Sequence, residues 1–147
     1  MPAWINTGFD EYARRLPRHV RIALTEIKPA TRAGTPSAAL VKQWQALEAQ
    51  RIAAAVSDNV RIVLDERGKS LTTSALARQI ERWQQDGRDV AFIIGGADGT
   101  ASTLQKSADM LWSLSPLTLP HGLCRVLLAE QIYRAVSLLA GHPYHRE

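Results

Sequence analysis

The fold of this chain is decided by the stretch VRIVLDERGKSLTTSALARQIERWQQDGRDVAFII, residues 60–94. It begins and ends with near-continuous apolar runs, Val60–Leu64 and Val90–Ile94, which are typical of strands covered on both faces. Between these runs, helical apolar spacing after a threonine cap predicts a helix over Thr73–Gln85. A strand, a helix and a second strand in this order predict a βαβ unit, and therefore a parallel sheet.

Before this unit, the sequence predicts a helix over Ile5–Leu16 that Pro17 ends, and a half-buried strand over Val20–Ile27. The stretch Lys28–Ser37 contains two prolines and a glycine, which predicts a loop. A second helix is expected over Ser37–Val56. Its apolar stripe is expected to consist of Leu40, Trp44, Leu47 and Ile52.

After the unit, the sequence predicts a short helix over Ser102–Leu111, a short strand over Leu117–Leu119 and a final helix over His121–Ala140. No change of composition marks a linker. A chain of 147 residues is long enough for one α/β domain with its own core. We therefore expect a single domain over residues 1–147.

Composition excludes several classes of protein. No apolar run reaches the roughly 18 residues that a membrane span needs, and the N-terminus lacks a signal-peptide pattern. The single cysteine, Cys124, cannot form an internal disulfide, so a cytoplasmic protein is expected. A net charge of +4 favours a polyanionic partner. The cluster Arg14, Arg15, Arg18 and Arg21 suits phosphate binding or a solvated helix end.

Three segments are candidates for one ligand crevice. Ile93–Gly99 ends a buried strand in a glycine-rich turn, where open α/β sheets bind ligands, although a plain strand-to-helix turn explains it equally. It lacks the dinucleotide and P-loop spacings, which disfavours NAD and ATP. The loop Leu114–His121 could hold an adenine or form a rigid connection. Leu64 and Asp65 border the same crevice by topology, and Asp65 could also cap the next turn.

The C-terminal tail, residues 142–147, carries two histidines, a tyrosine and an arginine. Chain ends are frayed by default, so this density of chemistry-bearing groups has two interpretations. The two histidines have no evident third metal ligand. Glu130 and Arg134 are spaced to form an ion pair. No hydrolytic constellation stands out, and Cys124 in an apolar helix is expected to be inert.

Taken together, several motifs closely resemble the bacterial ribosomal RNA large-subunit methyltransferase H family. They are Ile94-Gly95-Gly96, Trp112-Ser113-Leu114-Ser115, Leu117-Thr118-Leu119-Pro120-His121 and His142 to Glu147, and weaker matches extend the resemblance over essentially the whole chain. The resemblance implies a small SPOUT-type α/β fold with a C-terminal trefoil knot and a homodimer, without a metal or a membrane. It implies methyl transfer from S-adenosylmethionine to N3 of a pseudouridine in 23S rRNA of the assembled ribosome.

The resemblance also implies site residues. The cofactor site would consist of Leu64, Gly95, Leu114, Ser115, Pro116, Leu117, Thr118 and Leu119. In the implied reaction, Arg146 stabilises the base anion, His121 or His145 accepts or relays the proton, and Tyr144 orients or stacks the base. In a dimer, the tail would complete the partner's pocket.

The family ordinarily begins with an apolar strand ahead of the segment that matches Pro2-Ala3-Trp4. We therefore expect the sheet to lack one family strand, and a chain extended by that strand to melt at a higher temperature. Two other functions fit parts of the pattern. A non-catalytic RNA-binding assembly factor explains the basic charge, and a nucleotide-dependent oxidoreductase would use the same crevice.

Overall fold

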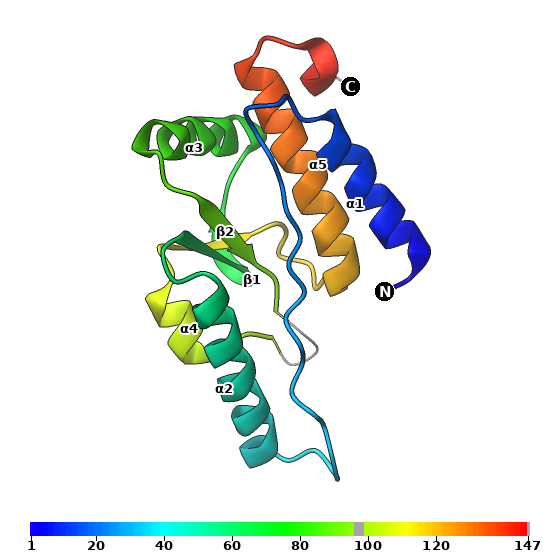
Figure 1. Ribbon diagram of the computed structural model, residues 1–147, viewed down its shortest axis with the longest axis vertical. Coiled ribbons are helices and arrows are strands. Elements are labelled where there is room, and N and C mark those ends of the chain that lie inside the picture. Colours follow the sequence, from blue (N-terminus) through cyan, green and yellow to red (C-terminus); the bar gives the residue numbers. More distant parts are fainter. Residues whose placement is uncertain (96–98, 147) are drawn as a thin grey trace.

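The computed structural model describes residues 1–95 and 99–146, with the side chains of 145 and 146 left out. At its centre is a parallel sheet of three strands in the order β2-β1-β3 (Figure 1). The strands are β1 (Val60–Ser70), β2 (Val90–Ile93) and β3 (Met110–Ser113). The expected α/β class and parallel sheet are confirmed. The central strand β1 carries the apolar run that the sequence marks as covered on both faces.

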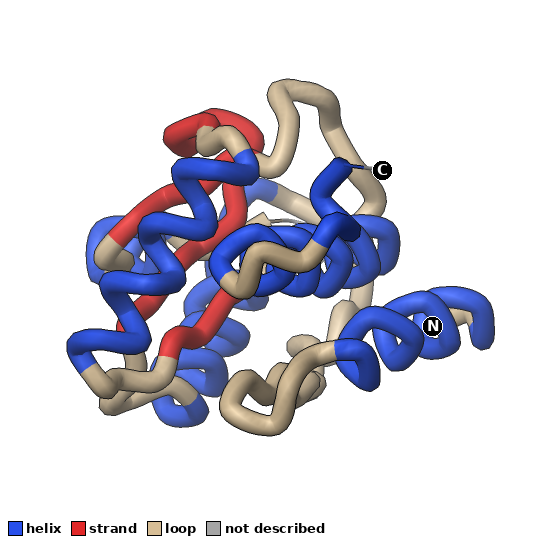
Figure 2. The backbone as a smooth tube through the Cα atoms, turned by 90° about the horizontal axis from the view of Figure 1, so that it is seen from above, coloured by secondary structure: helices blue, strands red, loops and turns tan. Residues whose placement is uncertain are grey.

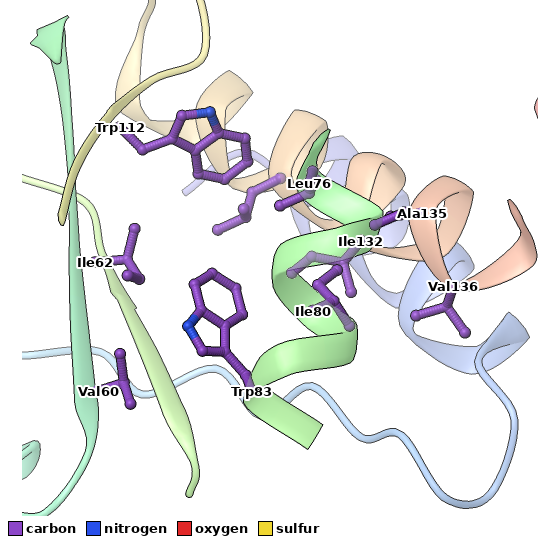
Figure 3. Packing of buried hydrophobic residues seen from close by; sticks show 11 residues of the cluster. Val60, Ile62, Leu76, Ile80, Trp83, Trp112, Ile132, Ala135 and Val136 are labelled. Atoms are coloured by element: carbon purple, nitrogen blue, oxygen red, sulfur yellow. The ribbon is translucent and has the colours of Figure 1, made fainter. Parts of the chain in front are cut away.

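Two helices, α3 (Thr73–Asp86) and α5 (His121–Leu139), cover one face of the sheet. Figure 3 shows Trp83 of α3 and Trp112 of β3 directed into the same core, which Ile62 of β1 faces. Ile62 is only 1% exposed. Burying a side chain of this size contributes about 1.5–3 kcal/mol. This face therefore ties the βαβ unit to the C-terminal helix.

The opposite face packs against α2 (Ala38–Ala55) and α4 (Ser102–Ser107). Val63 of β1 is fully buried there, together with Ile93 and Leu104. Alternate residues of a strand point to opposite faces of a sheet, so neighbouring residues of β1 supply both cores. The sheet is thus a middle layer between two layers of helices.

Helix α1 (Ala3–Arg15) lies alongside α5 and runs in the same direction (Figure 1). It buries Ile5 and Phe9, as the predicted spacing requires. The two helices approach closely at Gly8, where an added Cβ would lie 3.2 Å from Cγ1 of Val126. After α5, the 3-10 helix η1 (Pro143–Arg146) ends the described chain.

The prediction of a strand over Val20–Ile27 is wrong. Residues 16–37 are all described, and none of them belongs to a strand (Figure 2). Val20 and Ile22 still pack against the core, as their alternation predicts. Alternation fixes which side chains point inward, but a strand also needs a neighbouring edge that supplies hydrogen bonds. In the structure, residues 16–37 pair with neither of the two edge strands, β2 and β3.

The boundaries after β2 also differ from the prediction. Helix α4 ends at Ser107, and the predicted continuation to Leu111 is instead the start of β3. Short apolar runs fit a helix or a strand equally well by spacing alone. Residues 117–119, all described, form no strand. They lie between Pro116 and Pro120, which cannot donate backbone hydrogen bonds.

The predicted stripe of α2 is partly correct. Trp44 is 8% exposed, whereas Leu47 is 41% exposed and points away from the core. The buried face instead includes Ala49, with Ile52 and Val56 packed beside it.

In the part of the chain that the structure describes, we find no helix with the length and hydropathy needed to cross a bilayer.

Candidate cofactor and catalytic site

The carboxyl ends of the three strands bring several predicted site residues to one edge of the sheet. Leu64 of β1 pairs with Trp112, one residue before the end of β3. Gly95 follows the last residue of β2 by two positions, and Leu114 directly follows β3. Because parallel strands end at the same edge, Leu64, Gly95 and Leu114 border one region.

A bulge in β1 shapes this edge. Leu64 and Lys69 both pair with Trp112, so residues 65–68 protrude between them. Within the bulge, Asp65 Oδ1 accepts a hydrogen bond of 2.8 Å from the backbone N–H of Arg67. The Arg67 guanidinium, bonded to the same carboxyl, holds the pKa of Asp65 below its usual range. Of the two predicted roles for Asp65, the turn cap is confirmed.

The segment after β2 is held against this bulge. Gln105 Nε2 donates to Asp65 Oδ2 at 3.1 Å and to the hydroxyl of Thr100 at 3.0 Å. A Cβ added to Gly95 would lie 2.9 Å from the carbonyl carbon of Gly99, so close backbone packing requires glycine here. Gly96, Ala97 and Asp98 of the predicted turn lie outside the described residues.

The loop over residues 114–119 is fixed by two hydrogen bonds. The hydroxyl of Ser115 accepts from the backbone N–H of Leu117 at 3.0 Å. The hydroxyl of Thr118 donates to Glu66 Oε2 at 2.8 Å, which ties the loop to the β1 bulge. Leu117 is 70% exposed, and Pro116 and Thr118 are also exposed. These two bonds hold the loop in shape, and the side chains of residues 116–118 are open to solvent.

Two buried polar atoms lie at the start of this loop. The hydroxyl of Ser113 and Nε1 of Trp112 have no hydrogen-bond partner within the described residues. Ser113 is 4% exposed. A buried polar atom without a partner is costly, and such atoms mark positions where a water or a ligand is expected. Polar atoms beside exposed leucines suit a ligand with an apolar ring and polar groups.

Two hollows in the structure are lined by residues outside this loop. A cavity of about 20 Å³ lies between α2 and the segment around Gly95. A wider surface groove of about 510 Å³ is lined by Lys42, Arg67 and the first residues of α4. Residues 114–119 line neither of these two hollows. The predicted cofactor loop is therefore not enclosed by these parts of its own chain.

His121 is the first residue of α5 and follows the loop directly. Partial burial lowers the pKa of His121, and the nearby Arg125 guanidinium lowers it further, while Glu26 has the opposite effect. The Arg125 side chain is 9% exposed and donates from Nη1 to Glu26 Oε1 at 3.2 Å. The extended segment before α2 thus supplies a carboxylate that neutralises the buried cation next to His121.

The tail is packed against the opposite end of α5. Tyr144 is 9% exposed, and its hydroxyl donates to Glu130 Oε2 at 3.1 Å. Its ring centroid lies 4.6 Å from that of Tyr133, and the Arg134 guanidinium lies 4.8 Å from the ring. The predicted Glu130–Arg134 ion pair is confirmed at 2.9 Å. The side chains of His145 and Arg146 lie outside the described part of the chain.

The predicted catalytic residues consequently fall into two groups. His121 begins α5 and Tyr144 follows its end, as Figure 1 shows for the two ends of this helix. A helix of 19 residues is about 28 Å long. Tyr144 folds back over this helix as far as Glu130, nine residues after His121, so about 14 Å of helix separate the two groups in one chain.

Several contributors carried no signal in the sequence. Glu66 and Glu26 reach the site from separate segments, and only the fold reveals their bonds to Thr118 and Arg125.

Other polar residues have the simpler of their predicted roles. Arg14 and Arg15 bind Glu11 at the solvated end of α1. Burial raises the pKa of the Cys124 thiol, as expected for an inert cysteine. Among the described residues, no group of three potential metal ligands occurs.

Comparison with known proteins identifies the family of this chain. The family model described as "Predicted SPOUT methyltransferase" matches residues 1–145. This chain belongs to the SPOUT methyltransferase family, and the expected SPOUT fold class is confirmed.

The names of its curated relatives describe a narrower activity than the family description does. The proteins named "Ribosomal RNA large subunit methyltransferase H" of Burkholderia mallei (strain SAVP1) and Burkholderia pseudomallei (strain K96243) are each 57% identical to it. Each alignment spans 147 residues, 99% of this chain and 92% of the relative. The family resemblance is thereby confirmed, and the trefoil knot stays a prediction.

Proposed function

We propose that this protein is a homodimeric, S-adenosylmethionine-dependent enzyme that methylates N3 of a pseudouridine in 23S rRNA of the assembled ribosome. The observation that carries the proposal is 57% identity, over 99% of the chain, to proteins named for methylation of large-subunit ribosomal RNA. A basic chain with a net charge of +4 suits such a polyanionic substrate, and the cytoplasm is the compartment where it would meet ribosomes.

The carboxyl edge of the sheet suits the cofactor. Leu64, Leu114 and Leu117 offer apolar side chains for an adenine ring, and the backbone of residues 114–119 offers amides and carbonyls. The unpartnered hydroxyl of buried Ser113 adds a polar group at the start of this loop. Gly95 lies against the backbone of Gly99, where a side chain would not fit. S-adenosylmethionine, when bound, supplies a methyl group on a positively charged sulfur.

The residues of the chain must activate the acceptor nitrogen. The imino proton of the base titrates roughly two pH units above neutrality, so its removal at pH 7 costs on the order of 3 kcal/mol. A base at hydrogen-bond distance and a cation beside the forming anion both lower this cost. Holding the nitrogen in line with the methyl group contributes at least as much.

We assign these tasks to the two groups at the ends of α5. His121 or His145 accepts or relays the proton, and Arg146 stabilises the anionic base. Tyr144, buried against α5, orients the base by holding the tail in place. The lowered pKa of His121 suits this role, because an imidazole that is neutral at pH 7 can accept a proton.

The length of α5 is the argument for a dimer. Tyr144 is held at Glu130, about 14 Å along the helix from His121, so His121 and Tyr144 do not meet within one chain. In a twofold dimer, the tail of one subunit can reach the cofactor loop of the other. The exposed side chain of Leu117 and the open loop leave space for this tail.

The direct test is mass spectrometry of 23S rRNA from ribosomes that lack the modification, after incubation with the protein and S-adenosylmethionine. We expect a gain of one methyl group on the pseudouridine base, and little product on the free stem-loop. A non-catalytic assembly factor would bind ribosomes without this gain and would not bind the cofactor in calorimetry.

A further inference from the structure

Glu130, at the middle of α5, is the centre of a hydrogen-bond network that reaches the tail. Its Oε1 accepts from Gln131 Nε2 at 2.8 Å, and its Oε2 accepts from Arg134 Nε at 3.0 Å. The same Oε2 accepts from the Tyr144 hydroxyl at 3.1 Å. Gln131 in turn accepts from the Thr73 hydroxyl at 2.9 Å, so the network extends to the start of α3.

The network is shielded from solvent. The side chains of Glu130 and Arg134 are 15% and 21% exposed. A hydrogen bond to a charged group is stronger than one between neutral groups. The bond from Tyr144 to Glu130 is therefore strong enough to hold a short segment that follows a helix.

Tyr144 is also held by its ring. Tyr133 lies on one side at a centroid distance of 4.6 Å, and the Arg134 guanidinium lies 4.8 Å from the same ring. Tyr12 of α1 extends the aromatic cluster, at 6.4 Å from Tyr133. Burial, Tyr12 and Glu130 all raise the pKa of Tyr144, so its hydroxyl keeps the proton that it donates.

Tyr144 stands directly before the two residues to which we assign proton transfer and anion stabilisation. The four residues of η1 are otherwise a chain end, and such ends fray unless side chains anchor them. The direction in which residues 145 and 146 leave the fold is therefore set at Tyr144. A tail that completes another subunit's site must leave in one direction, because a shift of about 1 Å can reduce a rate about 100-fold.

We propose that Glu130 is a positioning residue for methyl transfer: by holding the hydroxyl of Tyr144 and the guanidinium of Arg134, it fixes the course of the C-terminal tail. Glu130 touches neither the base nor the cofactor. This inference rests on the proposed function, in which the tail acts on the base.

The test compares Glu130→Gln and Tyr144→Phe with the wild-type dimer on ribosomes that lack the modification. Glu130→Gln keeps the size of the side chain and removes its charge, and Tyr144→Phe removes only the hydroxyl. We expect each to lower kcat about 10- to 100-fold. KM for ribosomes, the Kd for S-adenosylmethionine and the dimer should stay within about twofold of wild type. The double variant should be no slower than the slower single variant, because both changes act on the same hydrogen bond: Glu130→Gln weakens it and Tyr144→Phe removes it.

Glu11→Gln is the matched control. Glu11 forms an ion pair with Arg15 at the same i to i+4 spacing on α1, and its carboxylate also binds Arg14. This variant should keep the wild-type kcat. A wild-type kcat in Glu130→Gln would overturn the proposal, as would a loss of kcat that parallels loss of cofactor binding or of the folded dimer.

A second measurement separates this inference from the proposed function. Amide hydrogen exchange over residues 142–147, without cofactor or ribosomes, should be at least about fivefold faster in Glu130→Gln and Tyr144→Phe than in wild type, and unchanged in Glu11→Gln. Unchanged exchange in the first two variants would overturn the positioning role. If wild type transfers no methyl group while the exchange results hold, the proposed function fails and the anchoring of the tail stands.

Discussion

His121 shows how the surroundings of one side chain can prepare it for proton transfer. Partial burial and the neighbouring Arg125 lower the pKa of His121, and Glu26 only partly offsets them. Protonation requires a second positive charge beside a guanidinium that is itself 9% exposed. The imidazole is consequently held in its neutral form, the form in which it can accept a proton.

The first prediction concerns the pH dependence of the reaction. If His121 is the base, kcat/KM falls as the pH drops through its pKa, because the protonated imidazole accepts no proton. Since that pKa is below the ordinary value of 6.5, the acidic limb should lie below pH 6.5. His121→Gln should lower the rate at pH 7.5 about 100-fold and remove this limb. A limb that is unchanged in His121→Gln assigns the proton to His145 instead.

Gly68, within the β1 bulge, carries the second prediction. A Cβ at this position would lie 2.7 Å from the carbonyl carbon of Leu111 and 2.8 Å from the backbone nitrogen of Trp112. Backbone atoms cannot move aside without breaking the pairing of β1 with β3. Gly68→Ala should therefore lower the free energy of unfolding by about 2–3 kcal/mol, measured by urea denaturation.

The matched control for this prediction is Gly34→Ala. Gly34 has a φ of +81° and nothing within 4 Å of an added Cβ, so only the backbone conformation opposes alanine. That costs about 1–2 kcal/mol. An equal or smaller loss in Gly68→Ala would show that strand pairing at the bulge adapts to a side chain.

At the scale of elements, the order of the βαβ unit was predictable and β3 was not. Within the unit, β1 continues past its predicted end at Leu64 to Ser70. The predicted strand over Val90–Ile94 and helix over Thr73–Gln85 agree with β2 and α3 to within one residue at each end. Their signals are local: continuous apolar runs, a threonine cap and a glycine after the helix. The segments over Val20–Ile27 and Met110–Ser113 depend on whether a neighbouring edge is available, which local spacing does not encode.

The candidate site likewise has a part that the sequence could predict and a part that it could not. Strand order alone places Leu64, Gly95 and Leu114 at one edge, because parallel strands share their carboxyl ends. The bond from Thr118 to Glu66 joins residues 52 apart in sequence. The bond from Tyr144 to Glu130 spans 14 residues and depends on a turn that brings the tail back over α5. Neither bond has a periodic pattern that could reveal it.

The third prediction concerns the bulge as an element. Asp65 binds the backbone of Arg67 and the side chain of Gln105, and its side chain is 11% exposed. Asp65→Ala should lower the free energy of unfolding by about 1–3 kcal/mol at pH 7. It should also weaken binding of S-adenosylmethionine, since the bulge supports the loop through Thr118. Exposed Asp58→Ala is the control and should change neither quantity.

The pH dependence of this effect has a definite sign. The folded-state pKa of Asp65 is below its ordinary value of 3.8, so its contribution is present above that value. It is lost as the pH falls through the folded pKa. The difference in stability between wild type and Asp65→Ala should therefore shrink below pH 3.8, and a constant difference at all pH values would contradict an ionic role for Asp65.

At the scale of the whole molecule, the fold of one chain separates the cofactor loop from the C-terminal tail, although the proposed reaction needs both at one base. The cofactor loop precedes α5, and the tail folds back only as far as Glu130, so about 14 Å of helix separate them in one chain. Within the described residues, the tail is anchored at Tyr144, immediately before residues 145 and 146. This arrangement is compatible with the proposed reaction if the tail of a second copy reaches the cofactor loop of the first.

The last prediction follows from this division and uses two variants that damage different halves. Arg146→Ala removes the cation of the tail, and Leu117→Glu places a charge in the cofactor loop at a side chain that is 70% exposed, so folding is preserved. Each homodimer should be inactive. If the tail acts on the partner's cofactor loop, a heterodimer contains one site with both halves intact. An equal mixture, after subunit exchange, should then regain about a quarter of wild-type activity. If the tail acts within its own chain, every site in the mixture has one damaged half and the mixture stays inactive, because an Arg146→Ala subunit always lacks its cation.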